Sequence, residues 1–218
     1  MKITLPIYVC WDENVDRYIL ENALDGLFDI ANLVPGDVDV RLHGPGPWGE
    51  GDFSSARWYV DRCLLANRQV NASRLLELIE DEPWQVEEEH LDLFITSRDI
   101  TARDSRGQFF NFLFGLSRAR LGSIVSFNRF GRDGSDSDMA LAAMRLMTRH
   151  EFGHVLGLVN SGVTNSDPRS DLYRGHCLNT CTMKQVVSVP ETEDLVHLLV
   201  SQGDLFCADC AAYLARDL

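Results

Sequence analysis

The hydrophobic and polar positions of the chain follow two different periods, and these periods predict its elements. Residues 3–9 and 37–42 place apolar side chains at loosely alternating positions, which is typical of strands. Between them, apolar residues of the segment 13–33 recur every three or four positions, which predicts a helix that ends before Pro35-Gly36. Further predicted elements are a short helix at 71–80 and apolar, buried strands at 91–96, 109–116 and 123–127.

The last third of the chain is predicted to be helical. Its longest helix is expected from about Asp138 to about Leu158, with two shorter helices near 191–201 and 204–217. The segment 54–68, earlier in the chain, is compatible with either helix or strand. Strands mixed with helices, followed by helices alone, predict a single α/β domain with a small helical C-terminal part. Its two parts are residues 1–158 and residues 159–218, the second beginning with a polar, irregular stretch at 159–175.

Composition narrows the class of protein. The 218 residues suffice for one domain, and the net charge of −13 argues against a general nucleic-acid binder and against docking to an anionic membrane surface. No apolar run is long enough to span a membrane, and the N-terminal run reaches Asp12 too soon for a signal peptide. We therefore expect a cytoplasmic protein, whose six cysteines stay reduced and bind metal more readily than they form disulfides.

The predicted long helix contains the motif H-E-x-x-H, formed by His150, Glu151 and His154. The spacing of four residues places both imidazoles on one helix face, one turn apart, where they can bind the same metal ion. Glu151 is adjacent and can accept a proton from a metal-bound water. The motif therefore predicts a zinc site with a general base beside it.

A third ligand is expected further along the chain. Gly157 can end the helix in a left-handed turn, and three residues later stands Asn160, which is a poor zinc ligand. We assign the third position to His176 instead, because it directly precedes Cys177 and so adjoins a group of cysteines. The weaker contenders, at 167 and 171, are aspartates without such a neighbour.

The grouping H-C-x3-C-x-M followed by C-x-x-C resembles the archaemetzincins, whose motif runs H-E-x-x-H-x-x-G-x-x-H-C-x4-C-x-M and then C-x-x-C. The likeness extends upstream to Thr96 and Asp99, to residues 111–116 and to Val125-Ser126. It implies a metzincin-like zincin fold: a mixed, twisted sheet, an active-site helix and a small, zinc-stabilised C-terminal helical subdomain. It implies a second, structural zinc and an apolar floor, Met183, beneath the catalytic zinc. The ligands implied for the structural zinc are Cys177, Cys181, Cys207 and Cys210.

Three departures from the family pattern fall in predicted loops or in the C-terminal helical part. Eighteen residues separate Gly157 from His176 where the family has two, so sixteen are inserted. Three residues separate Cys177 from Cys181 where the family has four. The stretch from Met183 to Cys207 holds 23 residues where the family usually has 17. Insertions of this kind are tolerated in loops.

The sequence favours a zinc-dependent metallopeptidase that hydrolyses peptide bonds through a zinc-bound water, with Glu151 as general base and a peptide or protein as substrate. One alternative is a non-catalytic zinc protein that only binds peptides, although a purely structural zinc needs no such base. Another places an acid, Glu191 or Glu193, in the third ligand position. The remaining histidines, cysteines and acidic runs have simpler interpretations as core or solvated residues: His43, His90, His197, Cys10, Cys63 and 87–89.

Overall fold

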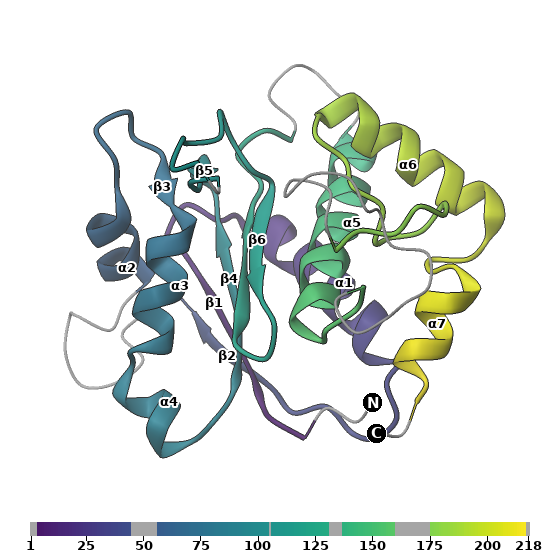
Figure 1. Ribbon diagram of the computed structural model, residues 1–218, viewed down its shortest axis with the longest axis horizontal. Helices are drawn as coiled ribbons and strands as arrows, with labels where there is room; N and C mark the ends of the chain where they lie inside the picture. Colours follow the sequence, from purple (N-terminus) through teal and green to yellow (C-terminus); the bar gives the residue numbers. More distant parts are fainter. Residues whose placement is uncertain (1–3, 45–55, 105, 131–136, 160–174, 217–218) are drawn as a thin grey trace.

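The computed structural model describes residues 4–44, 56–104, 106–130, 137–159 and 175–216, and its centre is a five-stranded sheet (Figure 1). Four neighbouring strands are parallel, and the fifth, β6, is an antiparallel edge strand. The mixed, mostly parallel sheet confirms the predicted α/β class. In spatial order the strands are β2 (Val40–Gly44), β1 (Ile7–Trp11), β4 (Leu91–Thr96), β7 (Gly122–Ser126) and β6 (Gly115–Arg118).

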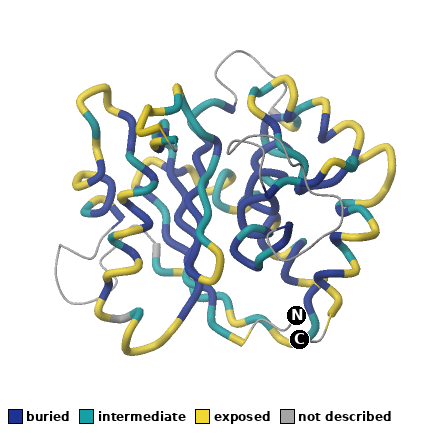
Figure 2. Tube along the Cα trace, viewed as in Figure 1, coloured by how far each residue is buried: buried dark blue, intermediate teal, exposed yellow. Residues whose placement is uncertain are grey.

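Helices cover both faces of this sheet, which is why β4 is buried along its whole length. Helices α1 (Arg17–Ala31) and α5 (Ser137–Val155) pack on one face and against each other. Helices α2 (Ala56–Cys63) and α3 (Ala72–Glu80) lie on the other face. Figure 2 shows the central strands and the inner sides of these helices as buried, so the sheet separates two apolar cores.

Two further helices follow α5 in the part of the chain that the structure describes. Helix α6 (Val189–Gln202) starts at Ser188, whose side chain accepts a hydrogen bond from Glu191 N, and ends at Gly203 with a φ of 77°. Helix α7 (Ala208–Leu214) follows. Their apolar side chains, among them Leu195 and Leu214, belong to the same core as α1 and α5. The C-terminal helices are therefore packed onto the main core.

The smaller elements lie beside the second core. Strands β3 (Val70–Asn71) and β5 (Ile100–Thr101) form a separate parallel pair, and α4 (Pro83–Glu87) follows α3. Asn71 caps α3 by accepting a hydrogen bond from Arg74 N, as a cap residue at the predicted start of this helix should. Within the described ranges no helix combines the length and apolar character needed to cross a membrane.

The prediction of a strand at 109–116 is wrong over most of this segment. Only Gly115–Arg118 pairs with β7, whereas the preceding aromatic run follows an irregular path along Ile100–Ala102. Its backbone is bonded there by Phe110 N to Ala102 O and by Leu113 N to Ile100 O. Consecutive aromatic residues predicted a strand because their local propensity is high, but tertiary contacts determined the path. The ambiguous segment 54–68 contains helix α2.

Candidate metal centres

The two histidines of the H-E-x-x-H motif lie one turn apart on α5, with their Nε2 atoms 3.2 Å from each other. His176 approaches the same point from outside the helix, with its ring centroid 5.1 Å from that of His150 and 4.9 Å from that of His154. The candidate ligand nitrogens of all three residues lie within 4.8 Å of one another. The structure thus brings together the three histidines predicted to form one site.

Burial favours the neutral form of the two imidazoles on α5, which is the form that binds a metal. Burial, together with the neighbouring His176, lowers the pKa of His150 to about 3, and burial with the other two imidazoles lowers the pKa of His154. The carbonyl of Thr182 accepts a hydrogen bond from His150 Nδ1 at 2.8 Å, so the lone pair of His150 is on Nε2. Three imidazoles, two of them held neutral by burial, therefore converge on one point, which suits a zinc ion with an open fourth position.

The chain leaves α5 through a left-handed turn at Gly157, whose φ is 81°, as predicted from its position. It re-enters the described part of the structure at Gly175, also in the left-handed region, and His176 follows at once. Residues 160–174 lie outside the described ranges, so Asn160 and the aspartates at 167 and 171 are not placed. Glu191, which one alternative made the third zinc ligand, accepts a hydrogen bond from Val187 N at the start of α6. Its carboxylate therefore caps this helix.

Glu151 is buried beside the three histidines and contacts the edge strand. Ser117 Oγ donates a hydrogen bond to Glu151 Oε2 at 2.5 Å. Burial raises the pKa of Glu151 to about 7, and the hydrogen bond from Ser117 opposes this shift only in part. A carboxyl group with a pKa near neutrality can both accept and return a proton at pH 7. The sequence did not point to Ser117, because nothing in its local pattern distinguishes it from other serines.

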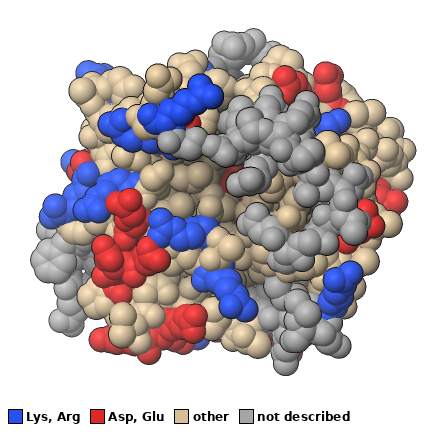
Figure 3. Space-filling model, viewed as in Figure 1, with Lys and Arg blue, Asp and Glu red and all other residues tan. Residues whose placement is uncertain are grey.

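A cleft of about 460 Å³ lies over these residues, between β6 with the segment before it and the chain after Met183. Figure 3 shows this face, with most of its basic side chains on the side of the sheet. Arg118 of β6 is paired with Glu80 of α3, so its charge is already partly compensated. The residues lining the cleft are mostly apolar apart from the histidines, Glu151 and a few amides and hydroxyls: Phe110–Ser117, Ala119, Met147, His150, Glu151, His154, Gly175, His176 and Gln185–Val187.

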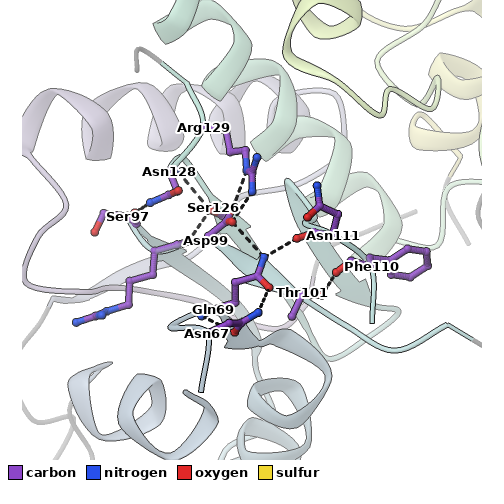
Figure 4. A network of polar contacts seen from close by, with 11 residues as sticks. Asn67, Gln69, Ser97, Asp99, Thr101, Phe110, Asn111, Ser126, Asn128 and Arg129 are labelled. Atoms are coloured by element: carbon purple, nitrogen blue, oxygen red, sulfur yellow. Dashed lines mark hydrogen bonds and ion pairs between the residues drawn. The ribbon is translucent and has the colours of Figure 1, made fainter. Parts of the chain in front are cut away.

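The aromatic segment 110–114 forms one rim of the cleft, and a network of polar contacts stabilises its backbone (Figure 4). Gln69 Nε2 donates to the carbonyl of Asn111 at 2.6 Å and to Asp99 Oδ2 at 3.1 Å. Asp99 in turn binds Arg129 through two hydrogen bonds, and the Arg129 guanidinium lies 4.0 Å from the Phe112 ring centroid. Asp99 of the T-x-x-D element therefore supports the rim of the cleft and lies outside the metal centre.

The four cysteines of the C-terminal part form the second cluster, with all four sulfurs within 4.8 Å of one another. Cys177 Sγ and Cys207 Sγ are 3.7 Å apart, close to the distance of about 3.8 Å between sulfurs on a tetrahedral zinc. Hydrogen bonds from Cys181 and Cys210 lower the pKa of Cys177, so the cluster favours a thiolate, the ligand form. The geometry and chemistry of the four sulfurs fit a closed structural zinc site.

The two clusters are joined by a short segment. Cys177 follows His176 directly, and Cys177 N donates to the carbonyl of Met183 at 2.8 Å. Met183 itself is fully buried, and its side chain packs against Gly153 of the active-site helix, between the two histidines of the motif. It is placed as an apolar floor residue, in agreement with the role that the family resemblance implies.

The remaining histidines, cysteines and acidic residues are core or solvated residues, as the sequence analysis interpreted them. Cys10 and Cys63 are buried core residues, and His90 is buried and stacks on Tyr8 at 4.0 Å. The ring of His43 contacts Tyr8 in a tilted arrangement, with the ring centroids 4.3 Å apart, whereas His197 and the acidic run 87–89 are exposed. Among the described residues, none of these joins a group that could hold a metal.

A mixed sheet, a helix carrying two histidines and a third histidine on the returning chain define a fold of the zinc-metallopeptidase type. The crystal structure of archaemetzincin from Methanopyrus kandleri is similar to this chain, with a TM-score of 0.64. The likeness covers 96% of this chain and 93% of that one, at 20% sequence identity. The fold is therefore archaemetzincin-like, as the motif resemblance implied. No protein-family model and no curated protein sequence matches the chain.

Proposed function

We propose that the chain is a zinc-dependent metallopeptidase in which His150, His154 and His176 bind the catalytic zinc and Glu151 is the general base. The observation that supports this most strongly is the convergence of three imidazoles beside a buried carboxyl group in an open cleft. Three protein ligands with a free fourth position are typical of catalytic zinc. A zinc protein that only bound peptides would not need the buried carboxyl group.

A zinc ion bound by these imidazoles would polarise a peptide carbonyl and lower the pKa of a water molecule. Glu151 would accept the proton of that water and return it to the departing amine, which its pKa of about 7 permits at neutral pH. The edge strand β6 lines the same cleft, so an extended peptide could add to this edge through main-chain hydrogen bonds. The predicted substrate is accordingly a peptide or protein bound in extended form.

The four cysteines would bind a second zinc ion, which gives two zinc ions per chain. Thiolates in this number and spacing fill all four positions of a tetrahedral zinc, so this ion would be structural. We place the protein in the cytoplasm, because reduced cysteines that cluster around a metal are typical of a reducing compartment.

The decisive experiment measures zinc content and cleavage of a mixed peptide library for the wild type and for Glu151→Gln. We expect about two zinc ions in both proteins, and cleavage by the wild type that falls by roughly a thousandfold or more in the variant. Glu87→Gln, a change of an exposed glutamate in α4, is the matched control and should cleave like the wild type. A zinc-loaded wild type that cleaves no peptide would favour the non-catalytic alternative.

A further inference from the structure

The hydroxyl group of Ser117 lies between two acceptors that both belong to Glu151. Ser117 Oγ is 2.5 Å from Glu151 Oε2 and 2.9 Å from the backbone carbonyl oxygen of the same residue. A serine hydroxyl has one proton to donate, and the shorter contact with the carboxylate is the one that a charged acceptor strengthens. Ser117 therefore fastens the carboxylate of Glu151 to strand β6.

Gly115, on the same strand, also contacts the side chain of Glu151. Residues 115 and 117 are two positions apart on β6 and so face the same side of the strand. A Cβ atom placed on Gly115 would lie 2.3 Å from Glu151 Cγ and 2.6 Å from Oε1, which is closer than atoms can approach. The side chain of Glu151 thus packs directly on the backbone of Gly115, and only glycine leaves room for it.

Strand β6, which contacts Glu151 through Ser117 and Gly115, is fixed by its pairing with β7. It pairs antiparallel with β7, with Gly115 opposite Val125 and Ser117 opposite Ser123. Of the two carboxylate oxygens, Oε2 is the one that accepts the bond from Ser117, and no described residue donates to Oε1. Oε1 lies against Gly115, and Glu151 lines the same cleft as the three histidines.

We propose that Ser117 is a positioning residue for Glu151: its hydrogen bond to Oε2 holds the carboxylate on β6 in one orientation beside the three histidines. This inference rests on the proposed function in one respect, since it takes Glu151 as the general base. A glutamate side chain has three rotatable bonds, and a shift of about 1 Å in a reacting group can reduce a rate by about a hundredfold. Without the bond, the carboxylate would lose its single orientation while the zinc ligands stay in place.

The variants that test this inference are Ser117→Ala, which removes the hydroxyl, and Ser117→Thr, which keeps it. For Ser117→Ala we expect kcat to fall by roughly 10- to 100-fold, with KM within about threefold of the wild type and unchanged zinc content. Ser117→Thr should retain kcat within about threefold. Ser117→Cys, which keeps the volume but donates only weakly, should behave like Ser117→Ala and replaces it if the alanine variant does not fold. Ser201→Ala, on the exposed side of α6, is the matched control.

A second measurement is independent of activity. Crystal structures of the zinc-loaded wild type, Ser117→Ala and Ser117→Thr should show the Glu151 carboxylate in one position in the first and third, and displaced or in several positions in the second. A carboxylate that stays in place in Ser117→Ala, or an unchanged kcat in that variant, would overturn the inference. A displaced carboxylate in a protein without peptidase activity would refute the proposed function alone.

Discussion

Gly153 and Met183 are in direct contact beside the histidines, although 29 residues of sequence separate them. A Cβ atom at Gly153 would lie 2.5 Å from Met183 Sδ and 3.1 Å from its Cε. Met183 is completely buried, so its side chain has no open space into which to withdraw. This contact determines how closely the segment carrying His176 and the cysteines approaches α5.

The substitution Gly153→Ala should therefore disturb both stability and the metal centre. We expect a loss of roughly 1 to 3 kcal/mol in the free energy of unfolding, because the added methyl group overpacks a filled core. The zinc held by the histidines should also be lost more readily to a chelator than in the wild type, because the displaced Met183 segment carries His176. Urea denaturation and timed chelation measure the two effects, and a variant with wild-type values of both would contradict the role of this contact.

Asp29 of α1 joins two arginines of the active-site helix, one of which immediately precedes His150. It accepts hydrogen bonds from Arg145 at 2.5 and 2.6 Å and from Arg149 at 2.8 Å, and Arg149 is almost completely buried. Replacing Asp29 by Asn leaves the Arg149 charge buried without compensation. We expect the free energy of unfolding to fall by about 2 kcal/mol, less than for a fully buried ion pair because Asp29 is partly exposed.

The same interaction gives a definite pH dependence. Burial raises the pKa of Asp29, but the hydrogen bonds and charges of Arg145 and Arg149 outweigh burial and lower it below its ordinary value. A carboxyl group whose pKa is lowered by folding stabilises the protein fully above its unfolded-state pKa of about 3.9. This stabilisation is lost as the pH falls through the lower folded-state pKa. The difference between wild type and Asp29→Asn should thus be complete at pH 7 and vanish in strong acid, and a constant difference would exclude this mechanism.

The assignment of the third zinc ligand can be tested with two variants. His176→Ala should contain about one zinc ion where the wild type contains about two, because only the cysteine cluster would still be intact. Asn160→Ala should retain both ions. Zinc analysis of the purified proteins measures the outcome, and the reverse pattern, with loss in Asn160→Ala and retention in His176→Ala, would show that the assignment to His176 is wrong.

The cysteine cluster should link zinc binding to folding. Because its residues lie both beside His176 and at the start of α7, Cys207→Ser should lower the zinc content and also lower the Tm, by roughly 5 °C or more. Cys63→Ser provides a control, since Cys63 is a buried cysteine outside the cluster and its replacement should leave the zinc content unchanged. A Cys207→Ser protein with full zinc content would exclude the cluster as a metal site.

The sequence by itself determined the features that depend on neighbouring residues. The spacing of His150 and His154 defines a shared helix face wherever a helix forms, and the periodicity of the long segment around them predicted that helix to within a few residues. The mostly apolar segment 91–96 predicted β4 at its observed bounds, since a strand covered on both faces is rich in apolar residues. The short spacings within the two cysteine pairs predicted that the members of each pair lie close together, and the family resemblance implied that the two pairs form one cluster.

The tertiary structure decided every relationship between distant segments. It brought His176 to the histidines of α5 and placed Glu151 against Ser117 and Gly115. It also paired Asp29 of α1 with an arginine of α5. Each of these contacts joins residues from different elements. The aromatic run before β6 had the propensity of a strand, yet its backbone bonds to Ile100–Ala102 directed it into the rim of the cleft. Local propensity amounts to only about 1 kcal/mol per residue, so packing and long-range hydrogen bonds determine which of the locally possible paths the chain takes.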